Sequence, residues 1–396
     1  MLRFIAALFV SWLLTSIATA SPTPITVWYF FQQTEKDTFL DIVDDFHKQH
    51  GETIQIKPRF IIFDAFSDKI SAAIPRKRGP DLFIYPQDRL GGWVEQGLLL
   101  PIDNNLTPAL TEQFYPKTLQ STYYKGNQYG LPVTFNSPAM IYNKRMMPEP
   151  PSTTQKLLSL AESTDPLEEN HFTFAYRYAD VYFHAMIFNA FGGEIFNQQM
   201  QPSINSQAFR RSFDVIKNWT TLGLPPTNSE ASVLELFNTQ QVSVVFEGPW
   251  FLRNIAANMD VGVAPLPVLS EANARLSPWA TVDSILMSHQ CKAPQAAFTF
   301  MSYLSGKEAQ ATLLNQTYIV SPNKMAYSMP GVTVKPQTQG FQEQLAYASL
   351  MPNNAEMTAF WGPATTALSR ILDNKEPAES ALERANAAIA QKLQAQ

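Results

Sequence analysis

Strand-like and helix-like hydrophobic patterns alternate between residues 25 and 85, and this alternation restricts the folds open to the chain. Apolar or alternating runs at 25–31, 53–57 and 82–85 are typical of strands. Between the first two, apolar residues recur at helical spacing from Phe39 to Phe46, after Thr34 as the expected cap; a second helix is indicated over 66–74. Strands joined by helices form parallel sheets with right-handed crossovers. The pattern therefore predicts an α/β fold.

The third of these strands is followed by side chains suited to binding a ligand. Gly79 and Pro80 mark the turn before it, and Pro86 ends it because proline cannot donate to a sheet ladder. Tyr85, Asp88 and Arg89 stand at that end, where α/β sheets bind ligands. An aromatic ring can cover a pyranose face while a charged pair bonds its hydroxyls. A solvated Asp–Arg surface pair is the alternative.

Several motifs resemble the maltose-binding proteins, which belong to the periplasmic solute-binding proteins that serve ABC importers. The similar stretches are Gly79-Pro80-Asp81, Tyr85, Asp88-Arg89-x-Gly91-Gly92, Gly97-Leu98-Leu99, Gly248-Pro249-Trp250, Met351-Pro352 and Ala359-Phe360-Trp361. Asp180-x-Tyr182 matches a Glu-x-Tyr pair of that family, with the acid shortened by one methylene. The resemblance covers nearly all of the chain after residue 20.

The resemblance implies a two-lobed α/β fold in which each lobe is a mostly parallel sheet flanked by helices. The expected first lobe is 21–134 plus 285–329, and the second is 138–280 plus 335–396. Three crossings near 134–138, 281–285 and 330–337 would act as a hinge that closes the lobes over a ligand.

The family's sugar-binding residues map onto seven positions here. The resemblance implies that Tyr85, Asp88, Arg89, Asp180, Tyr182, Trp250 and Trp361 bind ligand, with the tryptophans stacking on sugar rings. Some of these positions also have a structural alternative. Asp180 can be a helix cap, and the two tryptophans can be core residues.

Some charged family positions have changed. Phe30, Gln32 and Gln33 stand where the maltose binders have Asn, Asp and Lys; Asn136 replaces a Glu, Thr365 an Arg, and Tyr85 a Trp. Gln32, Gln33, Asn136 and Thr365 are therefore secondary ligand candidates, since amides and hydroxyls still bond sugar hydroxyls, although more weakly than charged groups. We expect a sugar, and maltose or a maltodextrin is one member of that class.

The first twenty residues predict export. Arg3, the apolar run 4–14 and Ala18-Thr19-Ala20 form a signal peptide with cleavage expected before Ser21. Cys291 is the only cysteine, so neither lipidation near the cleavage site nor an intrachain disulfide is possible. The formal charge of -5 and the absence of a basic block argue against nucleic acid and anionic membranes. We expect a monomer in the periplasm whose partner is an inner-membrane permease.

Two other functions compete with sugar delivery. A secreted glycoside hydrolase needs two carboxylates across the scissile bond, for which Asp88 and Asp180 are candidates. A binder of a phosphorylated polyol needs cations, and Arg89 is the evident one. The five histidines form no metal motif, so we expect no bound metal. We also expect neither a cofactor nor catalysis.

Overall fold

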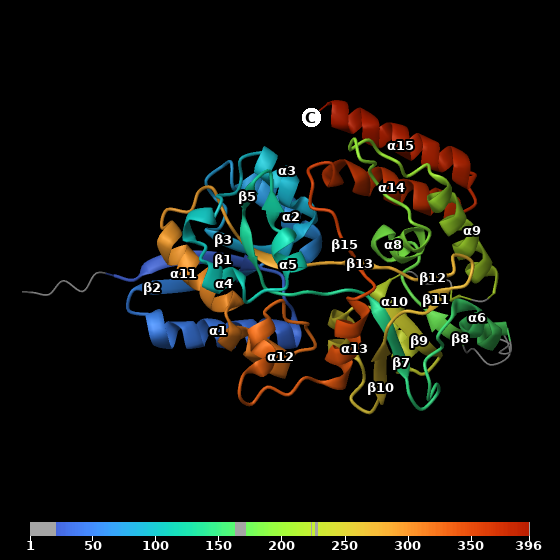
Figure 1. Cartoon of the computed structure of the whole chain (residues 1–396), viewed down its shortest axis with the longest axis horizontal. Helices are drawn as coiled ribbons and strands as arrows, with labels where there is room; N and C mark the ends of the chain where they lie inside the picture. Colours follow the sequence, from blue (N-terminus) through green and yellow to red (C-terminus); the bar gives the residue numbers. More distant parts are fainter. Residues whose placement is uncertain (1–20, 163–171, 223, 226–228, 396) are drawn as a thin grey trace, which may run out of the picture.

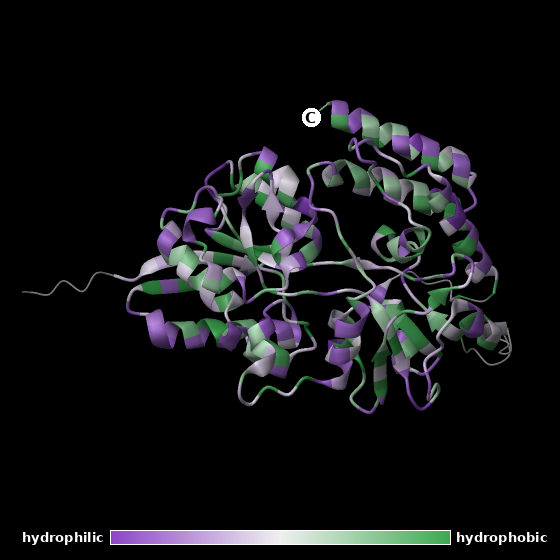
Figure 2. Ribbon diagram, viewed as in Figure 1, coloured by the Kyte–Doolittle hydropathy of each residue, from purple (hydrophilic) through white to green (hydrophobic). Residues whose placement is uncertain are grey.

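Two lobes, each built around one β-sheet, make up the computed structural model, which describes residues 21–162, 172–222, 224–225 and 229–395 (Figure 1). The expected signal peptide lies outside these residues. Figure 2 shows hydrophobic strands inside both lobes and a mixture of hydrophobic and hydrophilic residues along the surrounding helices, as expected when each helix buries one face.

The first lobe contains a five-stranded sheet. Its spatial order is β2–β1–β3–β14–β6, with β1 at Thr23–Tyr29, β2 at Ile54–Phe60, β3 at Leu82–Pro86, β6 at Gly130–Pro132 and β14 at Asp283–Met287. The expected strands and both intervening helices are confirmed, and β2 continues further than the sequence pattern indicated. A β-hairpin formed by β4 (Tyr123–Tyr124) and β5 (Asn127–Gln128) also belongs to this lobe.

Both faces of the first sheet are covered by helices because its strands alternate apolar side chains between two hydrophobic clusters. Val27 and Ile84 point to one cluster, while Trp28, Phe83 and Tyr85 point to the other. The first face carries α1 (Gln33–His50), α11 (Pro294–Ser305) and α12 (Lys307–Gln316). The second carries α2 (Phe63–Ala73) and α3 (Leu90–Glu95). The short helices α4 (Pro108–Thr111) and α5 (Pro116–Gln120) also belong to this lobe.

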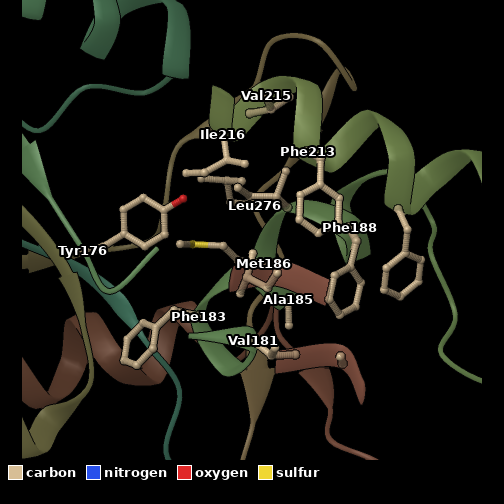
Figure 3. Packing of buried hydrophobic residues seen from close by; sticks show 14 of the residues in the cluster. Tyr176, Val181, Phe183, Ala185, Met186, Phe188, Phe213, Val215, Ile216 and Leu276 are labelled. Carbon is tan, nitrogen blue, oxygen red and sulfur yellow. The ribbon is translucent and has the colours of Figure 1, made fainter. Parts of the chain in front are cut away.

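The second lobe contains a four-stranded sheet. Its order is β10–β7–β9–β8, with β7 at Ala139–Asn143, β8 at Phe172–Ala175, β9 at Val242–Glu247 and β10 at Val261–Ala264. One face packs on α6 (Thr154–Glu162), α8 (Val181–Ala190), α9 (Gln207–Thr221), α14 (Met357–Leu372) and α15 (Ala378–Gln394); the other packs on α10 (Glu230–Asn238) and α13 (Pro336–Gln344). Figure 3 shows Met186 and Phe188 of α8 packed with Phe213 and Ile216 of α9.

Three passages of chain join the lobes. They run from β6 to β7, from β13 (Trp279–Ala280) to β14, and from the 3-10 helix η4 (Lys324–Ser328) to α13. Within the described residues, all strands of each main sheet run in one direction except β14 in the first and β7 in the second. Both reversed strands arrive from the other lobe, so they start at the interlobe edge where the parallel strands end. Both sheets are therefore mixed rather than mostly parallel, because two of the four strand pairings described in the first sheet and two of the three in the second are antiparallel.

One local expectation is wrong. Gln32, rather than Thr34, is the residue before α1, and no side chain caps that helix end. Gly306 has an extended backbone and separates α11 from α12. The segment after Gly248-Pro249 forms the short 3-10 helix η3 (Pro249–Asn254). Across the part of the chain that the structure describes, none of the helices combines the length and apolarity needed to cross a membrane.

Candidate functional site

A cavity of about 540 Å³ lies between the lobes and is lined from both of them. The first lobe contributes the segments after β1, β2 and β3, and the second contributes those after β8 and β9 together with Met351 and Trp361. Asn136, Thr281 and Asp283, from the passages between lobes, line it as well. The carboxyl ends of parallel strands meet at one edge of each sheet. Facing edges therefore bring together side chains that are far apart in sequence.

The seven main candidates all line this cavity. Among the secondary candidates, Gln32 and Asn136 line it, whereas Gln33 and Thr365 do not. Gln33 is exposed at the start of α1, and Thr365 is exposed on α14. The structure thus excludes Gln33 and Thr365 from the cavity wall in this conformation.

Asp88 and Arg89 follow β3 and form an ion pair with a 3.2 Å distance between Arg89 Nε and Asp88 Oδ2. The Asp88 side chain is only 9% exposed. Burial raises the pKa of Asp88 to about 6, while Arg89 and the nearby Trp361 indole oppose that rise. The indole N–H does not reach hydrogen-bond geometry with any described residue. Asp88 is therefore a desolvated acceptor next to an unused donor.

The ring of Tyr85 is not available for stacking in this conformation. Tyr85 is 5% exposed, and Phe63 stacks on it with ring centroids 5.4 Å apart and planes 11° apart. Phe66 and Trp93 pack against the same ring at 5.2 Å each. The expectation that this ring would cover a sugar face is not met, because Phe63, which sequence reasoning missed, lies over it.

The two tryptophans of the second lobe are held in defined orientations. The Trp250 indole lies against the backbone at Gly248, where an added Cβ would stand 2.3 Å from the ring. Its N–H donates to Glu247 Oε2 at 3.2 Å. Trp361 meets the buried ring of Trp279 edge-on, with centroids 5.7 Å apart and an angle of 79°. Both indoles remain partly exposed and line the cavity.

Asp180 is a helix cap as well as a cavity residue. Its carboxylate accepts a hydrogen bond from the Tyr182 backbone N–H at 2.9 Å, which satisfies the first turn of α8. Burial raises its pKa, and Arg177 opposes this. The cap interpretation is confirmed, and the position is compatible with a ligand contact.

Sequence reasoning missed a charged group beside Asp180. Arg177 Nε donates to Glu247 Oε1 at 2.8 Å, and its guanidinium lies 3.8 Å from Glu230. Burial raises the pKa of Glu247 to about 7 against the effect of Arg177. Arg177 also lies over the Phe183 ring at 4.1 Å. Its position directly after strand β8 is the signal that could have identified it.

A second missed pair connects the lobes. Glu35 on α1 accepts from Arg253 on η3 at 2.5 Å, and both side chains line the cavity. Within the described residues, each of the three cavity arginines, Arg89, Arg177 and Arg253, is paired with a carboxylate. Among the described residues of the cavity wall, no cation is therefore left unpaired for an anionic ligand, and Asp64 and Asp283 add further acceptors.

Asp283 lies at the start of β14 in the second interlobe passage. Its Oδ2 accepts from the Thr134 hydroxyl at 2.6 Å, and the Asn136 amide donates to the same hydroxyl at 3.0 Å. Burial raises the pKa of Asp283 to about 6. This network joins the first and second passages beside the cavity. No hydrophobic or spacing pattern marks Asp283 in the sequence.

Metal chemistry has no support from the described side chains. No group of three or more His, Cys, Asp or Glu residues among them is arranged to hold an ion. His184 is buried beside the Ser212 hydroxyl, and burial lowers its pKa to about 3. It belongs to the core of the second lobe.

Comparison with known proteins places this geometry among binding proteins. A family model described as bacterial extracellular solute-binding protein matches residues 41–340. A maltotriose-binding protein of Pyrococcus abyssi is 28% identical over 92% of this chain and 81% of its own length. A galactooligosaccharide-binding protein of Bacillus subtilis is 23% identical over 93% and 89%.

Solved structures agree with the fold. A cyclo/maltodextrin-binding protein complexed with maltotetraose superposes with a TM-score of 0.81 at 27% identity, covering 95% of this chain and 99% of that one. A maltotriose-binding protein of Thermus thermophilus gives a TM-score of 0.82 at 24% identity, covering 93% and 100%. The second likeness concerns the fold alone.

Proposed function

Because this chain belongs to the bacterial extracellular solute-binding proteins, we propose that it is the substrate-binding component of an ABC importer for a maltooligosaccharide or a related di- or oligosaccharide. The observation that carries this proposal is the composition of the interlobe cavity. Trp250 and Trp361 offer indole faces from one lobe, and Asp88 with Arg89 offers hydrogen-bonding groups from the other. Sugar rings need both kinds of surface.

We assign the sugar contacts to Asp88, Arg89, Asp180, Tyr182, Trp250 and Trp361, with Gln32 and Asn136 as neutral additions. Tyr85 contributes through its edge and hydroxyl because its ring face is covered. The lobes close about the three interlobe passages, and a ligand that touches both lobes favours the closed form. For the lobe division we propose the bounds expected from sequence, with the second part of the first lobe moved to begin at Asp283, where β14 starts.

The pairing of all three cavity arginines favours a neutral sugar over a phosphorylated polyol. A phosphate would have to displace a carboxylate from Arg89, Arg177 or Arg253 and would meet Asp64 and Asp283. We further propose that the sugar is released unchanged to an inner-membrane permease. Residues 1–20 would be removed on export to the periplasm.

Isothermal titration of the exported protein with glucose- and galactose-based sugars of two to four units tests the function. We expect saturable binding of at least one series and full recovery of intact sugar by chromatography. Small-angle scattering on the same samples should show a smaller radius of gyration with sugar. Binding of none of these sugars would contradict the proposal, and recovery of shortened sugar would favour a hydrolase.

A further inference from the structure

The cavity wall carries more negative than positive charge. Among the described residues that line it, the charged side chains are three guanidiniums and six carboxylates, with neither lysine nor histidine. The carboxylates belong to Glu35, Asp64, Asp88, Asp180, Glu230 and Asp283. Since each guanidinium is already paired with a carboxylate, a ligand enters a cavity whose remaining charge is negative.

Asp283 is the buried carboxylate of this wall that lacks a cationic partner. Three of the wall carboxylates are buried, and two of these, Glu35 and Asp88, pair with arginine. Asp283 is 7% exposed and takes part in no ion pair among the described residues. Asp64 also lies outside those ion pairs, but it is exposed, so solvent screens its charge.

The surroundings of Asp283 do not compensate its charge. Burial raises the pKa of Asp283 to about 6, the hydrogen bond from the Thr134 hydroxyl opposes this rise, and the charges of Glu35 and Asp88 add to it. A buried charge without a partner destabilises the folded state. The folded chain therefore holds a desolvated acceptor that a bound cation would stabilise.

A second acceptor in the cavity wall lies beside Asp283 and has no donor. Asn136 is 6% exposed, lines the cavity, and has no hydrogen-bond partner for its side-chain Oδ1 among the described residues. The Thr134 hydroxyl fixes the orientation of this amide. It donates its single proton to Asp283 Oδ2 at 2.6 Å, so it accepts from Asn136 Nδ2 at 3.0 Å. The amide oxygen is therefore left as a buried acceptor.

From these two acceptors we infer a cation site in which Asp283 and Asn136 bind a protonated amino group of the sugar ligand. An ammonium group has three N–H donors and no acceptor, so it can serve both oxygens, and its charge balances that of Asp283. A hydroxyl has one proton and leaves the charge in place. Among the described side chains no group of three His, Cys, Asp or Glu residues is arranged to hold a metal ion, so an amine fits this site better.

This inference rests on the proposed function and narrows the substrate class to an oligosaccharide that contains an amino sugar. It also gives a reason for an acid at position 283, where a neutral residue would cost less to bury. The cation site adds to the stacking and hydrogen-bonding surfaces of the cavity and replaces none of them.

Calorimetric titration of the mature chain at pH 7 with matched trisaccharides tests the cation site. The probes are maltotriose, its galactose-based counterpart, and derivatives of each in which one 2-hydroxyl is replaced by an amino group. We expect at least one amino derivative to bind roughly 10-fold more tightly than its neutral parent, the scale of a hydrogen bond to a charged group. The N-acetylated form of that derivative, which has the same nitrogen without the charge, should lose this gain.

The ratio of the affinities for the amino derivative and its parent is the readout for variants. Asp283→Asn should bring this ratio to within about twofold of equal affinity, and Asn136→Ala should lower it in part. Asp68→Asn is the matched control, because it removes an exposed carboxylate of α2 that does not line the cavity. It should leave the ratio unchanged.

Two results would overturn the cation site while leaving the proposed function standing. One is binding of the neutral sugars with no gain for any amino derivative, and the other is an unchanged affinity ratio in Asp283→Asn. A wild type that binds neither the neutral sugars nor their amino derivatives would overturn both.

Discussion

Glu35 and Arg253 form an ion pair across the cavity, with 2.5 Å between the Arg253 guanidinium nitrogen and the Glu35 carboxylate oxygen. Glu35 belongs to the helix after β1, and Arg253 belongs to the 3-10 helix after β9. Within the described residues, no other ion pair joins the two lobes. The side chains are 11% and 13% exposed, so solvent screens them little.

Glu35→Gln should shift the empty protein toward the open form. In the closed form the substitution leaves Arg253 buried without its counter-charge, whereas opening allows water to solvate it. We expect closure to weaken by about 1–3 kcal/mol, the scale of a hydrogen bond to a charged group. Small-angle scattering should show a larger radius of gyration without sugar, and calorimetry should show weaker binding.

Glu376→Gln is the control for that experiment because it breaks an ion pair with Arg370 and Arg384 inside the second lobe. It should change neither the radius of gyration nor the sugar affinity. If Glu35→Gln behaves like this control, the interlobe pair does not influence closure.

Trp361→Ala should weaken sugar binding by about 1–3 kcal/mol, the scale of a buried interface aromatic, and Trp250→Ala should do the same. Trp361→Phe should retain part of the affinity because a ring remains. Calorimetry gives the affinities, and circular dichroism establishes that each variant is folded. Unchanged affinity in folded alanine variants would mean that these indoles are core residues rather than sugar platforms.

Gly248→Ala should reduce sugar affinity with little loss of stability. The new Cβ would stand 2.3 Å from the Trp250 ring, and the flexible indole would move to relieve that contact. Gly362→Ala is a suitable control, since its Cβ would have no neighbour nearer than 3.5 Å and alanine favours the α14 helix. Equal affinities of the two variants would show that the indole position is not critical.

Asp283→Asn should make the empty protein more stable at pH 8. The folded pKa of Asp283, about 6, lies above its ordinary value of 3.8, so the folded state binds more protons in this window. Protonated Asp283 therefore adds to the free energy of unfolding, and this contribution is lost as pH rises from about 4 to about 6. An asparagine can still accept from Thr134 and carries no charge. Urea unfolding should show a gain of about 1–3 kcal/mol at pH 8.

The difference in unfolding free energy between Asp283→Asn and the wild type should disappear near pH 4, where Asp283 is already largely protonated in the folded protein. Glu376→Gln should instead lower the free energy of unfolding at pH 8. Arg384 and Arg370 lower the pKa of Glu376 to about 2, so its negative charge stabilises the folded state at this pH. A pH-independent difference for Asp283→Asn would indicate that its burial is not what shifts the titration.

N-terminal sequencing of the exported protein should begin at Ser21. The apolar run 4–14 followed by Ala18-Thr19-Ala20 is the basis of this expectation. A retained Met1 in the periplasmic fraction would contradict the proposed cleavage.

The sequence by itself determined the elements of the first lobe and the chemistry at their ends. Strand β3 could be predicted because apolar residues 82–85 and Pro86 act on their immediate neighbours in the chain. Asp88, Arg89 and Asp180 could be found because they follow such strands or precede a helix. Trp250 and Trp361 depended on similarity of motifs, since an indole in a cavity and one in a core have the same local pattern.

Only the tertiary structure decided which side chains meet. Glu35 and Arg253 are 218 positions apart in the sequence. They meet because the edges of the two sheets at which the parallel strands end face each other. Phe63 covers Tyr85 because the ends of β2 and β3 lie in one sheet, which no periodicity in either strand records. Gln33 and Thr365 fall outside the cavity because the start of α1 and the exposed face of α14 direct them to solvent. Packing between distant segments, unlike strand or helix formation, depends on the whole chain at once.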